Sequence, residues 1–238
     1  MEQKLTRELK IGAGRCDSSG RLGMYETFSV FMDHACEHAD LLGCGLNDMM
    51  QRGLLWVAVR SMVRFAGRPA MGEDTILTTW PLAPGRTTSE RDYILTDRDG
   101  NVLCEGKTEW TVIDAEKGRI VSPKSVFGED MSFCEEAVDL PAFSRFRTDP
   151  AVFRPMGSYR CASTDCDVEG HMNNTAYIRM MCAAVSTEEW KKLDTKIMEA
   201  YFASQVREGD ILSLYRYDEE GMIVFRAADS SGKSIFWM

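Results

Sequence analysis

Apolar residues recur at two different spacings along the chain, and these spacings predict its elements. From Met24 to Leu42 they fall three and four positions apart, which is typical of an amphipathic helix, and Gly43 ends it. A strand within 5–14 precedes this helix. The later runs are rich in β-branched and aromatic residues and predict strands at 54–65, 75–80, 91–96 and 102–113. Strand, helix and antiparallel meander together predict an α+β fold.

A second copy of this order follows a break in the pattern. Residues 123–152 form an acidic and then a basic stretch interrupted by Pro123, Gly128, Pro141 and Pro150, and they predict a linker that crosses the surface. Beyond it we expect a strand around Tyr159 and a helix from about Thr175 to Leu193. The strands expected after that helix lie near 197–205, 211–217, 222–227 and 233–237. The economical account is a duplicated unit, with repeats at 1–122 and 153–238.

Residues ahead of the two helices support the duplication. Three positions match at a constant separation of 150 (167 − 17), namely Asp17 with Asp167, Gly20 with Gly170 and Arg21 with His171. A turn around Gly72 is likewise similar to one around Gly209. The first copy has arginine where the second has histidine, and it lacks the second acid. We therefore expect one catalytic copy and one supporting copy.

The stretch 167–177 carries the candidate chemistry. Asp167, Glu169 and His171 alternate, so an extended segment would point all three side chains the same way. Asn173 or Asn174 can cap the helix that follows. Acid, histidine and amides would then meet at a helix N-terminus, which suits attack on a carbonyl and stabilisation of an oxyanion. A polar turn with a helix cap and a surface histidine is the competing interpretation, and the residues alone give the two equal weight.

Composition narrows the classes of function. The net charge of the 238 residues is −9, so we do not expect nucleic-acid binding, which needs a basic surface. No apolar run approaches the roughly 20 residues of a membrane span, and the first residues lack an apolar signal region. We therefore expect a cytoplasmic protein. None of the eight cysteines is spaced Cys-x-x-Cys, which argues against a zinc site.

Two histidines on the first predicted helix are a weaker candidate site. His34 and His38 are four residues apart, a spacing that two metal ligands on one helix face can have. Glu37 is not where the zinc-protease pattern His-Glu-x-x-His places its glutamate, and no third ligand is evident nearby. We expect neither a metal nor an organic cofactor.

The motif around His171 resembles the signature of the acyl-ACP thioesterases, Asp-x-Asn-x-His-x-Asn-Asn. It stands here as Asp-Val-Glu-Gly-His-Met-Asn-Asn over 167–174. The first half is also similar to this family, in the segment Glu-His-Ala-Asp-Leu-Leu-Gly over 37–43 and in Trp-Thr-Val-Ile-Asp over 110–114. The resemblance implies a double hotdog fold, in which each long helix is wrapped by a curved antiparallel sheet.

The working residues of the family carry over unevenly. Its aspartate and histidine match Asp167 and His171, but its asparagine position holds Glu169. Its downstream glutamate falls at Gln205, or at a neighbouring residue if the match is shifted by one. The cysteine that follows in many relatives is Val206, so a cysteine nucleophile is not expected. Two interpretations remain. Either the carboxylate and the amide have exchanged positions and roles between 169 and 205, or the site is degraded and only binds acyl chains.

The resemblance implies hydrolysis of fatty acyl thioesters carried on acyl carrier protein, with release of free fatty acid in fatty acid biosynthesis. Water would attack the thioester carbonyl, Glu169 or His171 would accept its proton, and Asp167 would orient the site. Gln205, or amides near Asn174 and Asn173, would stabilise the oxyanion and bind substrate. The alternatives are an acyl-CoA thioesterase and a non-catalytic module that binds acyl thioesters.

The resemblance also implies where the substrate lies. The acyl chain would occupy the first repeat, where Met24, Phe28 and Trp56 are candidates for its lining or for plain core. The carrier protein is acidic in this family, so binding needs a local basic patch. The candidates are Arg145, Arg147, Arg154 and Arg160, with Arg179, Lys191 and Lys192 as alternatives. A homodimer is possible.

Overall fold

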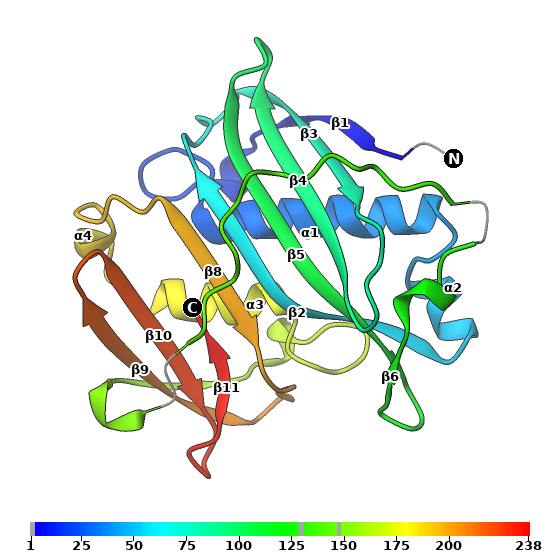
Figure 1. Ribbon diagram of the computed structural model, residues 1–238. Coiled ribbons are helices and arrows are strands. Elements are labelled where there is room, and N and C mark those ends of the chain that lie inside the picture. Colours follow the sequence, from blue (N-terminus) through cyan, green and yellow to red (C-terminus); the bar gives the residue numbers. More distant parts are fainter. Residues whose placement is uncertain (1–2, 129–130, 147–148) are drawn as a thin grey trace. The chain divides into compact units, whose positions relative to one another are not determined.

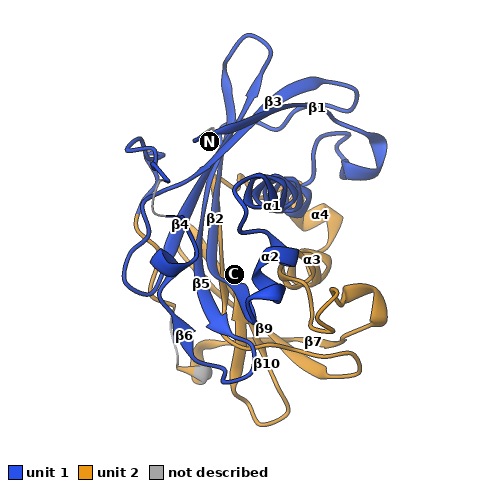
Figure 2. Ribbon diagram, turned by 90° about the vertical axis from the view of Figure 1, so that its right-hand side faces the viewer, with its two compact units in different colours: residues 1–141 blue, residues 142–238 orange. Residues whose placement is uncertain are grey.

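The structure is a computed structural model that describes residues 3–128, 131–146 and 149–238. The chain forms two compact units, Met1–Pro141 and Ala142–Met238 (Figure 2). Arg147, one of the predicted patch residues, lies outside the described residues. None of the helices in the described part of the chain combines the length and hydropathy that a membrane span needs.

The first unit places a long helix against an antiparallel sheet (Figure 1). Its helices are α1 (Met24–Leu41) and α2 (Leu46–Gln51). Its strands are β1 (Leu5–Lys10), β2 (Leu54–Phe65), β3 (Asp74–Pro81), β4 (Ser89–Asp97), β5 (Val102–Asp114) and β6 (Ile120–Val121). The sheet runs in the order β1-β3-β4-β5-β2, and β6 pairs with β5. The predicted helix and strands of this unit are confirmed to within a few residues at each end, except that the first strand ends at Lys10.

Helix α1 approaches the sheet closely because a glycine lies beneath it. Phe28, Phe31 and other apolar residues of α1 are buried on the side that faces the sheet. A Cβ on Gly106 of β5 would lie 2.6 Å from the Phe31 ring, so only glycine fits there. Tyr93 is the partner of Gly106 on β4, and its ring stacks on Phe31 with a centroid distance of 4.8 Å. This contact fixes the face of β4 that looks toward α1.

Residues 131–141 run over the opposite face of this sheet (Figure 1). The Trp80 indole donates to the Glu136 carbonyl at 2.8 Å, and the Val138 N–H donates to the Asp92 carboxylate at 2.9 Å. Asp92 neighbours Tyr93, and successive strand residues point to opposite faces. The first half of the predicted linker therefore packs on the first unit.

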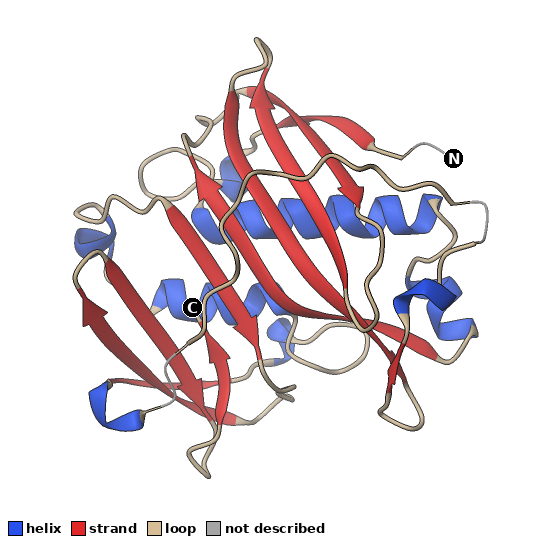
Figure 3. Cartoon of the chain, in the orientation of Figure 1, coloured by secondary structure: helices blue, strands red, loops and turns tan. Residues whose placement is uncertain are grey.

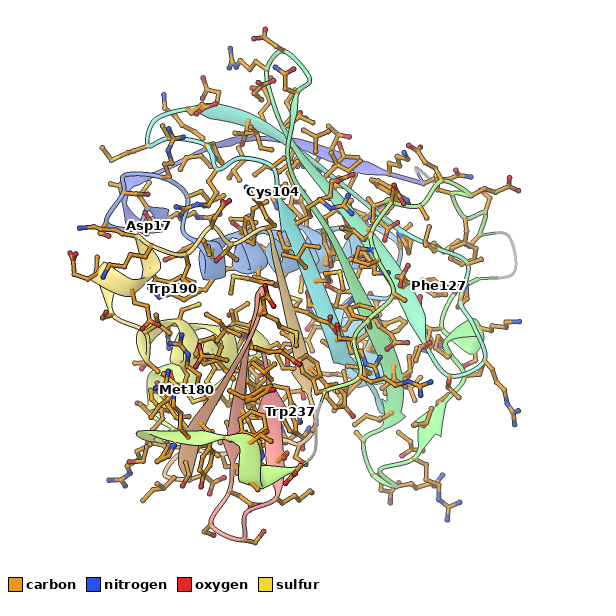
Figure 4. The ribbon with its side chains drawn as sticks, turned by 60° about the vertical axis from the view of Figure 1, so that its left-hand side comes forward. Asp17, Cys104, Phe127, Met180, Trp190 and Trp237 are labelled. Atoms are coloured by element: carbon orange, nitrogen blue, oxygen red, sulfur yellow. The ribbon has the colours of Figure 1, made fainter. Side chains whose placement is uncertain are left out.

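The second unit repeats the plan with a shorter helix (Figure 3). Its helices are α3 (Asn174–Ala183) and α4 (Thr187–Trp190). Its strands are β7 (Arg154–Arg160), β8 (Ile197–Phe202), β9 (Ile211–Glu219), β10 (Met222–Ala228) and β11 (Ser234–Trp237). They run in the order β8-β11-β10-β9-β7 and are antiparallel to their neighbours. Trp237, labelled in Figure 4, is the centre of an aromatic cluster that helps to form the core of this unit. The ring centroids of Phe153 and Phe146 lie 5.6 and 5.8 Å from that of Trp237.

The single helix predicted from about Thr175 to Leu193 is wrong beyond Ala183. The Ser186 side chain accepts from the Glu189 N–H and caps α4, which begins a new helix. The Ser-x-x-Glu spacing is a signal for a helix start that the apolar periodicity masked. Both units still consist of a helix on an antiparallel sheet, which confirms the α+β class.

Candidate active site

The turn ahead of α3 is closed by its own backbone. The Asp167 N–H donates to the His171 carbonyl at 2.8 Å, and the Gly170 N–H donates to the Asp167 carbonyl at 3.0 Å. The Asp167 carboxylate accepts from the N–H groups of Glu169 at 2.9 Å and His171 at 3.4 Å. Gly170 has a φ of +72°, which favours glycine. The expectation of an extended segment is therefore wrong, and Asp167 holds a turn that presents Glu169 and His171.

The helix start matches the prediction for Asn173. Its side chain accepts from the Thr175 N–H at 2.9 Å, which makes it the cap of α3. Its own N–H donates to the Asp165 carbonyl at 2.8 Å, and this bond ties the turn to the preceding segment. Asn174 opens the helix, so its N–H belongs to the first turn, where backbone amides have no acceptor within the helix.

The His171 imidazole is the most unusual group of the turn. Both of its nitrogens are buried, and neither has a hydrogen-bond partner among the described residues. Buried polar atoms are nearly always paired, because leaving one unpaired costs about 1–3 kcal/mol. An imidazole kept in this state can donate to, or accept from, a bound substrate or water.

The Glu169 carboxyl has a raised pKa. Burial raises the pKa of its carboxyl above the ordinary value, and the negative charge of Asp167 raises it further. A carboxyl with a raised pKa is a better proton acceptor once ionised, which suits a general base. It lies two residues from His171 on the same turn.

Gln205 lies in a segment that two hydrogen bonds anchor to this turn and to α3. The Ser204 carbonyl accepts from the Tyr177 hydroxyl at 3.1 Å, and the Val206 carbonyl accepts from the Met172 N–H at 2.8 Å. Gln205 is exposed, whereas the Val206 side chain is buried. Among Ser204, Gln205 and Val206, Gln205 is therefore the residue with a long, exposed polar side chain.

A buried carboxylate, Asp165, lies next to the turn, and no motif in the sequence indicates it. Asp165 accepts from the Tyr159 hydroxyl and the Ala162 N–H, both at 2.8 Å, and it pairs with Arg179 of α3. Burial raises the pKa of Asp165, but these three partners more than offset it and the net pKa is lowered. Only tertiary packing brings these groups together, and the sole signal in the sequence was an aspartate two residues before Asp167.

The turn ahead of α1 has the same backbone. The Asp17 N–H donates to the Arg21 carbonyl at 2.9 Å, and the Gly20 N–H donates to the Asp17 carbonyl at 2.9 Å. The Asp17 carboxylate, labelled in Figure 4, pairs with Arg68. The Arg21 guanidinium donates to the Arg68 carbonyl at 2.8 Å. Asp17, Arg21 and Arg68 therefore all have partners, in contrast to the His171 imidazole.

The equivalence of the two turns identifies the counterpart of Gln205. In the first unit the Leu22 N–H donates to the Pro69 carbonyl at 2.9 Å. In the second unit the equivalent bond runs from the Met172 N–H to the Val206 carbonyl. Pro69 thus corresponds to Val206, and the residue before each, Arg68 and Gln205, also correspond. Since the Arg68 side chain reaches Asp17, a side chain at position 205 has the location needed to reach the turn at Asp167.

The predicted acyl-lining residues all belong to the first unit. Phe28 is buried in α1, while Met24 and Trp56 are half-buried. The Trp56 indole donates to the Cys44 carbonyl at 3.0 Å and its ring packs on a core cluster that includes Met49. Core packing accounts for Phe28 and Trp56 in this structure, so their role as lining stays a prediction.

The two histidines of α1 have protein partners. His34 Nδ1 bonds the Val30 carbonyl oxygen at 3.0 Å, and His38 Nδ1 lies 3.0 Å from the Arg91 guanidinium. A guanidinium beside His38 opposes a cation at that ring. Across the described ranges, no group of three or more potential ligands could hold a metal ion.

The predicted basic patch divides into engaged and exposed residues. Arg154 pairs with Asp218 at 3.0 Å, and Arg179 pairs with Asp165, so both have structural partners. Arg145 and Arg160 are exposed. Of the alternatives, Lys191 pairs with Glu188 at 3.1 Å and Lys192 is exposed.

Two family models cover most of the chain. The N-terminal domain of acyl-ACP thioesterases matches residues 2–126, and the C-terminal domain matches residues 154–232. The chain belongs to the acyl-ACP thioesterase family. This membership confirms the resemblance that the motif at 167–174 indicated.

Relatives and solved structures agree with this assignment. A chloroplastic acyl-[acyl-carrier-protein] hydrolase of Cuphea viscosissima is 23% identical over 87% of the chain and 52% of its own length. Oleoyl-acyl carrier protein thioesterase 1 of Arabidopsis thaliana is 22% identical over 89% of the chain and 61% of its own length. The chain thus spans about half to three fifths of these relatives.

Solved structures show the fold. An acyl-ACP thioesterase from Bacteroides thetaiotaomicron superposes with a TM-score of 0.87 and 18% identity, over 99% of this chain and 96% of that one. The 12:0-ACP thioesterase from Umbellularia californica superposes with a TM-score of 0.81 and 15% identity, over 100% of this chain and 96% of that one. The chain has the double hotdog fold that the resemblance implied.

Proposed function

We propose that this protein hydrolyses fatty acyl–acyl carrier protein thioesters and releases free fatty acid in fatty acid biosynthesis. The observation that carries the proposal is the His171 imidazole, buried at both nitrogens and unpaired within the described residues, on the turn that opens α3. Family membership supplies the reaction class. The proposal requires neither metal nor organic cofactor, and the acyl carrier protein is the expected partner.

The proposed reaction is direct attack by water. A water molecule adds to the thioester carbonyl carbon while Glu169 or His171 accepts its proton. The carbonyl oxygen becomes an oxyanion, the carbon–sulfur bond then breaks, and the proton passes to the departing thiolate. The raised pKa of Glu169 suits the acceptor role. Asp167 does not touch the reacting atoms in this scheme, because its carboxylate is engaged by the turn amides.

Two groups are proposed to stabilise the oxyanion. Gln205 has an amide that can donate, and its segment is anchored beside the turn through Met172. The N–H of Asn174 lies at the helix N-terminus, where the backbone favours negative charge. One such donor typically contributes about 3 kcal/mol to transition-state stabilisation.

The competing function is an acyl-thioester binding module without catalysis. The observation that favours it is the departure from the family signature, with Glu169 at an asparagine position and Gln205 at a glutamate position. Asp167 and His171 are retained, which supports catalysis over binding alone. The cytoplasm is the expected compartment, which is consistent with eight free cysteines.

A matched pair of variants tests the proposal. His171→Ala should lower fatty acid release from acyl carrier protein about 10²- to 10⁴-fold, the range for loss of a positioned acid–base group. Arg21→Ala, at the equivalent position of the first unit, should stay within about tenfold of wild type, or about 1.4 kcal/mol in the barrier. Circular dichroism would confirm that both variants are folded. Unchanged turnover in His171→Ala would overturn the proposed site.

A further inference from the structure

The inner face of the first sheet carries a polar stripe where apolar residues are expected. On β4, Arg91 is two residues from Tyr93, and both face α1. Thr108 of β5 is the direct partner of Arg91, and Trp110 follows it on the same face. Ser61 of β2 pairs in turn with Thr108, and their hydroxyls are 2.9 Å apart. The stripe therefore crosses three strands beneath the helix.

Arg91 is a buried cation that has no anionic partner in the part of the chain that the structure describes. Its side chain contacts His38 Nδ1 at 3.0 Å and the Thr79 hydroxyl at 3.4 Å. A guanidinium only donates, so His38 Nδ1 is the acceptor in this contact. No carboxylate of the described residues lies within ion-pair distance of Arg91. Burial lowers the pKa of Arg91, and buried charges are ordinarily paired.

Two further donors of the stripe are unused. The Tyr93 hydroxyl and the Trp110 indole N–H are buried, and neither has a hydrogen-bond partner among the described residues. Thr108 and Trp110 are polar neighbours of the Tyr93 hydroxyl, yet neither reaches it in hydrogen-bond geometry. The inner face of the sheet thus carries two donors that are unpaired within the described residues, from Tyr93 and Trp110, and the cation of Arg91.

We propose that Arg91, Tyr93 and Trp110 form a binding site for an oxygen acceptor on the acyl chain, so that the protein prefers oxygen-bearing acyl groups to plain alkyl groups. The inference rests on the proposed function, because it concerns the substrate of that reaction. A hydroxyl oxygen can accept from two of these groups, whereas a carboxylate can accept from all three and also compensates the charge of Arg91. A methylene chain leaves the same donors unpaired.

The stripe lies where the predicted acyl-binding residues are found. Phe28 and Phe31 are one turn apart on the buried side of α1, and Phe31 stacks on Tyr93. An acyl chain packed between α1 and the sheet beside Phe28 would reach the stripe through Tyr93. A site built to pair a substrate oxygen rejects analogues that lack it far more strongly than an apolar pocket rejects an extra methylene.

Tyr93→Phe is the sharpest variant, because the hydroxyl it removes has no hydrogen-bond partner within the described ranges. The thioesters compared are decanoyl-, ω-hydroxydecanoyl- and ω-carboxynonanoyl-acyl carrier protein. Wild type should show a higher kcat/KM for at least one oxygenated chain, and Tyr93→Phe should lower that preference about tenfold, the scale of one hydrogen bond. Its unfolding temperature should be unchanged or higher. Arg91→Met should lower the preference about 10²-fold.

Controls separate this inference from the proposed function. Tyr215→Phe removes a tyrosine hydroxyl from the second unit and should leave the preference unchanged. Calorimetric binding of the same acyl groups, linked to the carrier arm as non-hydrolysable amides, gives a second readout. Hydrolysis of decanoyl-acyl carrier protein alone tests the proposed function. A preference for the plain chain in both readouts, or an equal preference in wild type and Tyr93→Phe, would overturn the inference and leave that function standing.

Discussion

The two turns that open α1 and α3 share one backbone and differ in their charges. In the first, Asp17 pairs with Arg68, and the Arg21 guanidinium donates to a carbonyl. In the second, His171 keeps both nitrogens unpaired within the described residues, and Gln205 stands at the position of Arg68. The duplicated fold thus provides two equivalent places for chemistry. The charged groups of the first turn have protein partners, whereas the His171 nitrogens of the second have none within the described residues.

The helix starts show the same difference. In the first unit, a Cβ on Gly23 would lie 1.9 Å from the Glu26 carboxylate, so that carboxylate folds back over the start of α1. Ala176 is the equivalent residue in α3 and has no group to fill this space. A helix N-terminus already covered by a carboxylate cannot also stabilise an oxyanion. The two helix starts therefore differ in whether an acidic side chain covers the N-terminal amides.

The largest expected effect in the second turn comes from the Glu169 and Gln205 pair. Glu169→Asn leaves two amides and no second acid, so proton abstraction is lost. Gln205→Glu places two carboxylates at the site, which raises one pKa further and removes an oxyanion donor. Each single variant should lower kcat about 10²-fold or more.

The double variant, Glu169→Asn with Gln205→Glu, restores the arrangement of the family and should recover much of that loss. Such non-additivity is expected of residues that act as a unit. Steady-state kinetics on one acyl carrier protein thioester measures all three proteins. A double variant no better than the product of the two single effects would reject the exchange of roles.

Gln205→Arg copies the first turn into the second and should close it. An arginine there can pair with Asp167 as Arg68 pairs with Asp17, and its charge lowers the pKa of Glu169. Because wild-type activity should fall as pH drops through the raised pKa of Glu169, the acid limb of the kcat/KM profile should move to lower pH. The maximum should fall at least tenfold, about 1.4 kcal/mol. Gln205→Met, which removes the amide without adding charge, should lower kcat and leave the limb in place.

The basic patch should affect the carrier protein more than the chemistry. Arg145→Glu with Arg160→Glu changes two exposed residues and should raise KM for the carrier-protein substrate about tenfold, since the overall fields of two acidic proteins repel. A small acyl thioester should be hydrolysed as before. The matched control reverses two exposed cations of the first unit, Arg119→Glu with Lys124→Glu. Equal effects on both substrates would show that the patch is structural.

The smallest expected effect is on stability in the first turn. Asp17→Asn breaks the pair with Arg68, which is partly exposed, and should cost about 0.5–1 kcal/mol of unfolding free energy at pH 7. The pKa of Asp17 is lowered in the fold, because hydrogen bonds and the charge of Arg68 outweigh its burial. Its contribution is therefore present above the unfolded pKa near 3.8 and is lost as pH falls through the folded value.

Urea unfolding at pH 7 and pH 3 would measure that change. The difference between wild type and Asp17→Asn should shrink at the lower pH, and thioester turnover should be unaffected. Asp99→Asn, at an exposed loop aspartate, is the matched control. A loss of several kcal/mol, or a loss equal at both pH values, would contradict the assignment.

The sequence predicts local structure best where an interaction between residues close in the chain determines it. Helical spacing located α1, and the cap at Asn173 follows from a side chain that bonds its own helix. The alternation at 167–171 predicts an extended segment, but the Asp167 carboxylate bends the backbone there by accepting from the N–H groups of Glu169 and His171. Hydrogen bonds from the backbone to this short polar side chain favour a turn here, although the residues alternate as in a strand.

The sequence did not reveal the interactions that distinguish the two turns. Arg68 reaches Asp17 across 51 residues of chain, and Arg179 reaches Asp165 from another element. No local pattern encodes such pairs, since each depends on how helix and sheet pack. The motif could identify His171, but only the structure shows that its nitrogens are unpaired within the described chain.

The central claim is that the wild-type protein is a hydrolase of acyl carrier protein thioesters. The most direct measurement is free fatty acid released from one acyl group presented on acyl carrier protein, on coenzyme A and on a small thiol. The account predicts that the protein releases fatty acid faster than buffer does from each carrier whose thioester it binds. The highest kcat/KM is expected for the acyl carrier protein thioester. Release no faster than in buffer from every carrier, from a protein that still binds the acyl group, would contradict it.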